Sequence, residues 1–259
     1  MIRSFIIFLK SFPVPVISWK IKCKLFNIKM PSLPEWQNHF DNNKGIEIGG
    51  PSHIFTKTGY LPLYPKINSL DGINFSSSTV WEGNLSEGDN YHFGNKMGHQ
   101  FILEGSKLNV IKDNSYDFLL SCNNLEHIAN PISAMLEWKR VIRNKGYILL
   151  ILPNKIANFD HRRPYTTFEH LQNDFKNQLE ETDPTHLEEI LILHDLKRDP
   201  QARPFDKFRK RCENNYENRC MHHHVFDQDL LKKMATFCGL EVVRQFTSCT
   251  DHFILLKKP

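Results

Sequence analysis

The sequence lacks any pair of cysteines with the CxxC spacing, although it contains six cysteines among its 259 residues. This absence excludes zinc-ribbon sites, which depend on closely spaced thiolate ligands. In a chain of this length we interpret isolated cysteines as reduced thiols that are mostly buried. Low-complexity tracts are absent too, and an apolar content of 40% is enough for a globular core.

The chain also lacks a long apolar run near its start. The run Phe5–Leu9 is shorter than the roughly 7–15 apolar residues of a signal peptide, and Lys10 interrupts it. A membrane-spanning helix would need about 20 apolar residues, which this segment does not have. We therefore expect a cytoplasmic protein.

Acidic residues are missing from the first 34 positions, which contain six Lys or Arg. A basic, aromatic-rich segment of this kind can rest on an anionic membrane surface. The alternative is a solvated segment that packs over the main domain. We expect a basic N-terminal segment, residues 1–40, for which peripheral contact with the inner membrane surface is one hypothesis.

Strand-like and helix-like patterns alternate along most of the remaining chain. Short, fully apolar strands that alternate with helices indicate a parallel sheet covered on both faces. The sequence therefore predicts an α/β, doubly wound, Rossmann-like fold. The expected elements are strands at residues 45–50, 67–72, 100–105, 116–123, 147–154, 241–248 and 252–258, and helices at 132–142 and 226–240.

This alternation stops between residues 155 and 220, in a polar stretch that is rich in His, Asn and Arg. One helix is expected within the stretch, at residues 184–196, where apolar side chains recur on one face. Asp227 has the character of an N-cap for the following helix, and Gly239 of its C-terminal stop. We interpret residues 41–259 as one domain that carries an insertion at residues 155–220.

The loop after the first strand lacks both common phosphate-binding patterns. No GxxxxGK[ST] is present, and the text "GGPSHIF" puts Pro51 where a GxGxxG loop would close on a pyrophosphate. Glu47 precedes the glycines and would repel a phosphate, whereas a cationic ligand would be attracted. Asp71 is expected at the end of the second strand as a ribose acceptor, and Glu104 at the end of the third as an adenine acceptor. These acids describe a nucleoside with a positively charged tail, such as S-adenosylmethionine.

Two long stretches carry a family resemblance, residues 45–154 and 226–257. The texts "IEIGGPS" and "LEGSKL…DNSYDFLLSCNNLEHIANPISAMLEWKRVIRNKGYILLILPN" resemble class I S-adenosylmethionine-dependent methyltransferases of the type 11 group. The resemblance implies a seven-stranded sheet whose strand seven is antiparallel. It also implies S-adenosylmethionine as cofactor, with Glu47, Gly49 and Gly50 at the methionine end, Asp71 at the ribose, Glu104, Gly105 and Ser106 at the adenine, and Ser121, Cys122 and Asn123 near the sulfonium.

Methyl transfer to a hydroxyl needs a base, and histidine is the usual choice. The first histidine-bearing motif is "LEHI". In related quinone-biosynthesis methyltransferases an acid-x-x-Glu-His block holds a divalent cation, but here Asn123 and Asn124 stand before Leu125. We therefore assign no metal ligands and interpret Glu126 and His127 as residues that begin a helix.

The second motif, "FDHRRPYTTFEH", directly follows the fifth strand at the ligand edge. Asp160 and His161, followed by two arginines, are typical of an acid-oriented base beside an anion clamp. The alternative is a loop that surface salt bridges hold in place.

The third motif is "NRCMHHHVFD". In an extended segment alternate side chains share a face, so His222 and His224 should point one way and His223 the other. Two histidines do not make a metal site without a third protein ligand. We regard His222 and His224 as candidates for the base or for a wall of the acceptor pocket, with a structural role as the alternative.

Positive charge gathers in the insertion, where residues 197–219 contain eight Lys or Arg and four acids. Such a patch favours an anionic acceptor or a membrane surface. A nucleic-acid partner is not favoured, because the overall pI of 8.6 is mild and no RNA-binding module is present. The insertion is expected to form the acceptor pocket.

Taken together, these features predict an O-methyltransferase that acts on a polar small molecule, a glycan or a lipid-linked sugar, in glycan biosynthesis. The glycan follows only from the resemblance and from the polar insertion. One rival is a methyltransferase for RNA or protein. Another is a non-catalytic relative that serves as a partner subunit. The acceptor atom, the base and the oligomeric state stay open.

Overall fold

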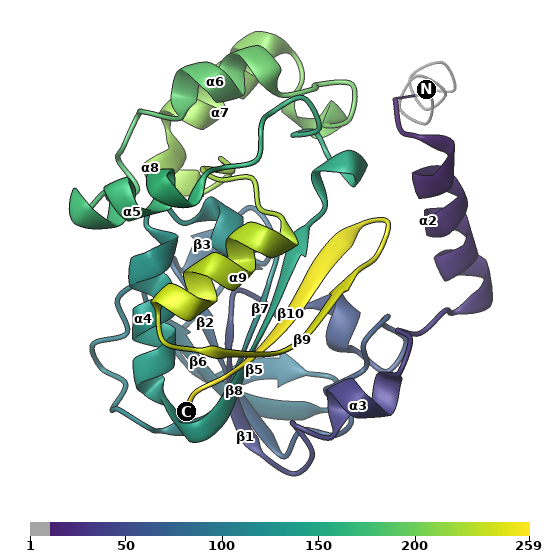
Figure 1. Ribbon diagram of the computed structural model, residues 1–259, viewed down its shortest axis with the longest axis vertical. Coiled ribbons are helices and arrows are strands. Elements are labelled where there is room, and N and C mark those ends of the chain that lie inside the picture. The colour runs from purple at the N-terminus through teal and green to yellow at the C-terminus, as the bar shows by residue number, and fades with distance from the viewer. Residues whose placement is uncertain (1–10) are drawn as a thin grey trace.

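The computed structural model describes residues 11–259, in which eight strands form one mixed sheet (Figure 1). Their order across the sheet is β5-β6-β2-β1-β7-β8-β10-β9. The strands are β1 (Lys44–Ile48), β2 (Ser69–Asn74), β5 (Gly88–Phe93), β6 (Lys96–Ile102), β7 (Tyr116–Cys122), β8 (Ile142–Pro153), β9 (Glu241–Thr247) and β10 (Asp251–Lys257). A small separate hairpin consists of β3 (Ser78–Thr79) and β4 (Gly83–Asn84).

The five strands from β6 to β8 run parallel, and β10 is antiparallel to both of its neighbours, β8 and β9. This arrangement confirms the predicted doubly wound α/β fold with an antiparallel last strand. The sheet has one strand more than expected. The extra strand, β5, pairs antiparallel with β6 at the edge, and its polar sequence gave no strand signal.

The helices are α2 (Val14–Phe26), α3 (Leu33–Gln37), α4 (Pro131–Val141), α5 (Phe168–Lys176), α6 (Leu187–Leu193), α7 (Phe205–Glu213), α8 (Asn215–Asn218) and α9 (Gln228–Phe237). Figure 1 shows α4 and α9 in front of the sheet. Met135 and Trp138 on α4 and Met234 on α9 bury their side chains in the core on that face. The opposite face is covered by α3 and the loop after β1, and its core includes Trp36 and Phe40.

Helix α9 begins and ends where the sequence predicts. The Asp227 side chain accepts a hydrogen bond of 2.8 Å from the Leu230 backbone N–H, which satisfies one of the free donors of the first turn. Gly239 follows the helix with a φ of +67°, a left-handed conformation that glycine adopts without steric cost. The strand β9 then returns to the sheet.

The apolar run Phe5–Leu9, with Arg3 and Lys10, lies outside the described residues. From position 11 onward, Phe12 and Val16 pack against Ala157 of the main domain. Further along α2 the side chains of Ile21 and Leu25 are exposed. Within residues 11–259, no helix has the length and apolar character needed to cross a membrane.

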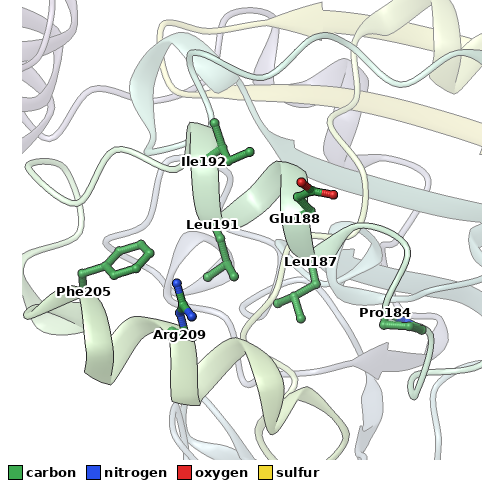
Figure 2. A pocket seen from close by; sticks show the side chains of 7 residues that line it. All are labelled: Pro184, Leu187, Glu188, Leu191, Ile192, Phe205 and Arg209. Atoms are coloured by element: carbon green, nitrogen blue, oxygen red, sulfur yellow. The ribbon is translucent and has the colours of Figure 1, made fainter.

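Helices α5 to α8 gather on one side of the molecule, between β8 and α9 in the sequence (Figure 1). Only the helix at α6 was predicted from the sequence. The insertion has a small core of its own, which includes Ile190, Phe208 and Met221. A hollow of about 380 Å³ lies between α6 and α7. Figure 2 shows Leu191 and Arg209 among the side chains that line it. Arg209, one of the cations of the predicted basic patch, therefore lines this hollow.

Candidate functional site

A cleft of about 1160 Å³ opens at the carboxyl ends of β1, β2 and β7. In open α/β sheets this edge is where ligands bind, because the loops there diverge to opposite faces of the sheet. The glycine loop after β1 and the loop after β7 form one side of the cleft. Phe159 and Arg219 of the insertion, with His222 just after it, line the other side.

The glycine loop lies against the cleft and admits no larger residue. Gly49 and Gly50 have φ angles of +66° and +134°. A Cβ atom on Gly49 would lie 2.6 Å from Asn124 Nδ2, and one on Gly50 would lie 2.7 Å from Glu47 Oε1. Both positions therefore need glycine, and the backbone is left open to a ligand.

Glu47 does not line the cleft as predicted. Side chains alternate along β1, so Ile48 faces the α4 side and Glu47 the opposite core. Its carboxylate accepts hydrogen bonds from the hydroxyls of Tyr64 (2.8 Å) and Tyr91 (2.7 Å) and from the Ser52 backbone N–H (3.2 Å). Burial raises the pKa of Glu47 to about 7, although these donors act to lower it. Through these hydrogen bonds Glu47 stabilises the loop from its buried side rather than from the cleft.

The expectation that Asp71 ends the second strand is wrong. Strand β2 continues for three more residues, because Gly72 and Ile73 extend it to Asn74. The Asp71 carboxylate lies outside the cleft and accepts hydrogen bonds from the Tyr116 hydroxyl (2.8 Å) and the His99 backbone N–H (3.0 Å). Asn74, the last residue of β2, lines the cleft instead. Its side-chain amide donates a hydrogen bond to the Gly50 carbonyl (3.2 Å).

Of the three residues predicted to contact the adenine, two line the cleft. Glu104 and Gly105 line the cleft, and Ser106 is not among the lining residues. The Glu104 carboxylate forms an ion pair of 2.9 Å with Arg219, which reaches it from the insertion. Burial raises the pKa of Glu104, although the charge of Arg219 acts in the opposite direction.

The end of β7 also meets the cleft. Cys122 and Asn123 line it, whereas Ser121 is buried within the strand and does not. Burial holds the pKa of the Cys122 thiol well above its usual range, so this group is neutral. Asn123 has a φ of +48°, a left-handed conformation, and the chain turns there into the loop that continues with Asn124.

The predicted Asp160–His161 pair is wrong, because each residue has a different partner. Asp160 Oδ2 lies 2.5 Å from His222 Nδ1, and His161 Nε2 lies 3.0 Å from Asp195 Oδ2, outside the cleft. Asp160 is fully enclosed and also accepts a hydrogen bond of 3.1 Å from the Arg163 guanidinium. Burial acts to raise the pKa of Asp160, but His222 and Arg163 hold it at about 2.

Of the three consecutive histidines, His222 alone lines the cleft, where His53 and His127 also lie. Its Nδ1 is bound to Asp160, which leaves Nε2 as the nitrogen that can meet a ligand. Burial acts to lower the pKa of His222, but the charge and hydrogen bond of Asp160 outweigh it, and the pKa is raised. An aspartate thus orients an imidazole at the cleft, as the sequence interpretation expected for Asp160 with His161, but the two residues lie far apart in the chain.

The three consecutive histidines take three different partners. His224 Nε2 lies 2.9 Å from Asp174 Oδ2, and His223 Nε2 lies 3.1 Å from Asn215 Nδ2. The buried Arg163 donates to the carbonyls of His222 (2.7 Å) and His223 (3.0 Å) and so fixes this segment. His222 and His224 therefore do not share a site, although alternation had suggested one.

Glu126 is a residue of the cleft that the sequence interpretation passed over. Both of its carboxylate oxygens are buried and have no hydrogen-bond partner within residues 11–259. Burial raises the pKa of Glu126 to about 7. Beside it, the ring of Trp81 meets that of His127 edge to face at 5.3 Å. The "LEHI" motif was a signal for this site, but its position suggested only the start of a helix.

Several arginines of the insertion form ion pairs or hydrogen bonds within the protein. Arg219 pairs with Glu104 and also lies 3.3 Å from Glu181, and Arg211 pairs with Asp199 at 2.9 Å. Other arginines of the stretch donate to backbone carbonyls. These contacts reduce the positive charge that the cleft presents to a ligand.

Residues 81–150, from the β3–β4 hairpin into β8, match the family model of a methyltransferase domain. No curated protein matches the chain. The structure is similar to a chain in the complex of the Haloferax volcanii Trm112 methyltransferase activator, with 10% identity, 93% of this chain and 92% of that chain covered, and a TM-score of 0.50. This likeness shows the fold.

Two further structures are similar at lower TM-scores. They are a SAM-dependent methyltransferase from Aquifex aeolicus (11% identity, 90% of this chain and 92% of that chain, TM-score 0.43) and one from Methanosarcina mazei (15%, 89% and 99%, TM-score 0.44).

The residues of the cleft fit S-adenosylmethionine. Binding sites for molecules of this size have volumes of roughly 300–1,000 Å³, which the cleft provides. Gly49 and Gly50 bring backbone to the wall of the cleft. The unpartnered carboxylate of Glu126 favours a cationic ligand over a phosphate. With the methyltransferase-domain match over residues 81–150 and the doubly wound sheet, these features support S-adenosylmethionine-dependent methyltransferase activity.

Proposed function

We propose that this methyltransferase acts on a hydroxyl group of a polar small molecule, a glycan or a lipid-linked sugar. The observation that supports the proposal is the Asp160–His222 pair, whose imidazole lines the cleft. A hydroxyl holds its proton at neutral pH, so its methylation needs a base within hydrogen-bond reach. Methylation of an already deprotonated acceptor would not need this pair.

Each protein group has a separate task in this proposal. When bound, S-adenosylmethionine supplies a methyl group on a positively charged sulfur. His222 Nε2 accepts the hydroxyl proton, and the Asp160 carboxylate stabilises the imidazolium that forms. Arg163 holds Asp160 and the His222 carbonyl in place. The backbone at Gly49 and Gly50, with Asn123, would hold the cofactor.

The lining of the cleft supports a neutral, polar acceptor. Trp81 and Phe159 offer aromatic faces on which the C–H groups of a sugar ring can pack. Asn124 and Asn158 add amide groups that can bind hydroxyls. Because Arg219 is already paired, the cleft gives less support to the anionic acceptor that the basic patch suggested.

A matched pair of histidine variants tests the base. His222→Ala should lower kcat by about 10²–10⁴-fold, the usual contribution of a general base, with S-adenosylhomocysteine affinity unchanged. His161→Ala is the control, because His161 also has an aspartate partner but lies outside the cleft. Turnover would be followed on a panel of glycans and sugar nucleotides. Equal turnover of the two variants would remove His222 as the base.

The same panel, extended with RNA and protein acceptors, separates the rival functions. Methyl transfer to RNA or to protein, with none to glycans, would replace the proposed acceptor class. S-adenosylmethionine binding without transfer to any acceptor would favour a partner subunit.

A further inference from the structure

Four side chains with metal-binding atoms, three from the insertion and one from the segment that follows it, converge away from the cleft. His170 and Asp174 are one helical turn apart on α5, His186 precedes α6, and His224 precedes α9. One nitrogen or oxygen atom of each lies within 4.8 Å of those of the other three. None of the four side chains lines the cleft. Three separate segments of the chain therefore meet at one point.

The distances within this cluster are those of a small coordination site. His170 Nε2 lies 2.8 Å from His186 Nε2 and 3.3 Å from Asp174 Oδ2, and His224 Nε2 lies 2.9 Å from the same oxygen. In a tetrahedral zinc site with bonds of about 2.0–2.2 Å, neighbouring ligand atoms are about 3.4 Å apart. The cluster needs to open by only a few tenths of an ångström to enclose an ion.

Arg163 lies near enough to act on the histidines of the cluster, but it pairs with Asp160 and Glu189 instead. Burial, with repulsion from neighbouring histidines and from Arg163, lowers the pKa of His186 to about 3 and that of His224 well below its usual range. Burial raises the pKa of Asp174 to about 6, and among the described residues no Lys or Arg forms an ion pair with it.

Contacts around the cluster orient two of its members. His186 Nδ1 faces Asp183 Oδ2 at 3.5 Å and Thr185 Oγ1 at 3.4 Å, the position at which metal-bound histidines usually have a partner. The backbone carbonyl of Asp174 accepts a hydrogen bond of 3.3 Å from the side chain of Asn130, the N-cap of α4. His170 is the half-exposed member and leaves a route from solvent.

We propose that His170, Asp174, His186 and His224 bind one zinc ion. Three imidazole nitrogens and one carboxylate suit zinc better than magnesium or calcium, which prefer oxygen ligands. Four protein ligands leave no open position, so the site is structural. The ion would join α5, α6 and the segment that carries His222, two residues from His224. This inference does not depend on the identity of the acceptor.

The test is the metal content of tag-free protein. Inductively coupled plasma mass spectrometry should find one zinc ion per chain, which His186→Ala and Asp174→Asn lose. The exposed His92 provides the control, and His92→Ala should keep its zinc. Removal of the ion by a chelator should lower the Tm of the wild-type protein by roughly 5 °C or more, and added zinc should restore it.

Two results would overturn the proposal. One is a wild-type protein that holds no metal after equilibration with micromolar zinc and whose Tm is insensitive to zinc and chelator. The other is zinc that survives His186→Ala but disappears in Glu126→Gln, since Glu126, His127 and His222 form a second group of close potential ligands.

Cobalt(II) titration of chelator-treated wild-type protein adds a readout that needs no variant to fold. A four-coordinate site gives strong visible absorption, and a featureless spectrum would also contradict the proposal.

Discussion

The cofactor edge of the sheet and the insertion at residues 155–220 are built in different ways. At the cofactor edge, a residue's place follows from its position on a strand and the turn that ends it. Gly49 and Gly50, which directly follow β1, are the example. In the insertion, function depends on pairs that the chain brings together from a distance, such as Asp160 with His222.

The difference shows what a charged side chain means in each region. At the cofactor edge, Glu104 lines the cleft and pairs with one arginine, Arg219. An acid in the insertion has a buried partner: Asp160 has His222 and Arg163, and Asp174 has His170 and His224. Charges there stabilise the insertion first, and a single imidazole of this network reaches the cleft.

Removing one charge from the long-range pair gives the largest expected effect. Asp160→Asn keeps the volume but loses the carboxylate that raises the pKa of His222. We expect kcat/KM to fall by about 100-fold, because the base is no longer oriented. The base works unprotonated, so the acidic limb of the pH–rate profile should move to lower pH.

The control for that variant is Asp195→Asn, which removes the carboxylate beside His161. It should change neither the rate nor the profile. An acidic limb that stays in place in Asp160→Asn would show that His222 does not set it, and the contrast between the two regions would lose its main support.

Glu126 lies where the two regions meet and gives an intermediate effect on stability. Its pKa is raised from 4.5 to about 7 in the folded protein, so the folded state holds this proton more tightly than the unfolded state. The free energy of unfolding should therefore fall as pH rises from about 4.5 to 7, by at most about 3 kcal/mol. Glu126→Gln should remove this part of the slope and be the more stable protein at pH 7 and above.

Urea unfolding between pH 4.5 and 8 measures that slope. Glu87→Gln, at an exposed position, is the control and should retain the wild-type dependence. The Glu47 carboxyl has a similar pKa and contributes in the same direction, so the comparison is between variants rather than with a flat line. An unchanged slope in Glu126→Gln would mean that the carboxylate finds a partner in solution.

The smallest expected effect concerns which residue of β2 contributes to cofactor binding at the edge of the sheet. Asn74→Ala should weaken S-adenosylhomocysteine binding about fivefold, since it removes a hydrogen bond worth about 1 kcal/mol to the Gly50 carbonyl. Asp71→Ala should leave the affinity unchanged, because its carboxylate lies outside the cleft. Calorimetry measures the S-adenosylhomocysteine affinity of both variants. The reverse ranking would restore Asp71 as the ribose acceptor.

The sequence was sufficient for the fold because its signals are local. Apolar strands, the cap at Asp227 and the stop at Gly239 are readable within a few residues. The position of Asp71 was missed because Gly72 and Asn74 are weak strand formers, and the strand continues through them by pairing with β1 and β6. The partners of Asp160 and Asp174 could not be predicted, because nothing within one helical turn of either residue specifies His222 or His224.

Arg219 adds a consequence for how the two sides of the cleft communicate. Its guanidinium reaches from the insertion to Glu104 beside β6 and to Glu181, so one side chain joins both walls. A ligand that takes Glu104 as its partner competes with Arg219 and alters the wall on which the acceptor rests. By thermodynamic reciprocity, an acceptor that shifts this wall changes the affinity for the ligand at Glu104 by the same factor. The two substrates are thereby expected to bind with linked affinities rather than independently.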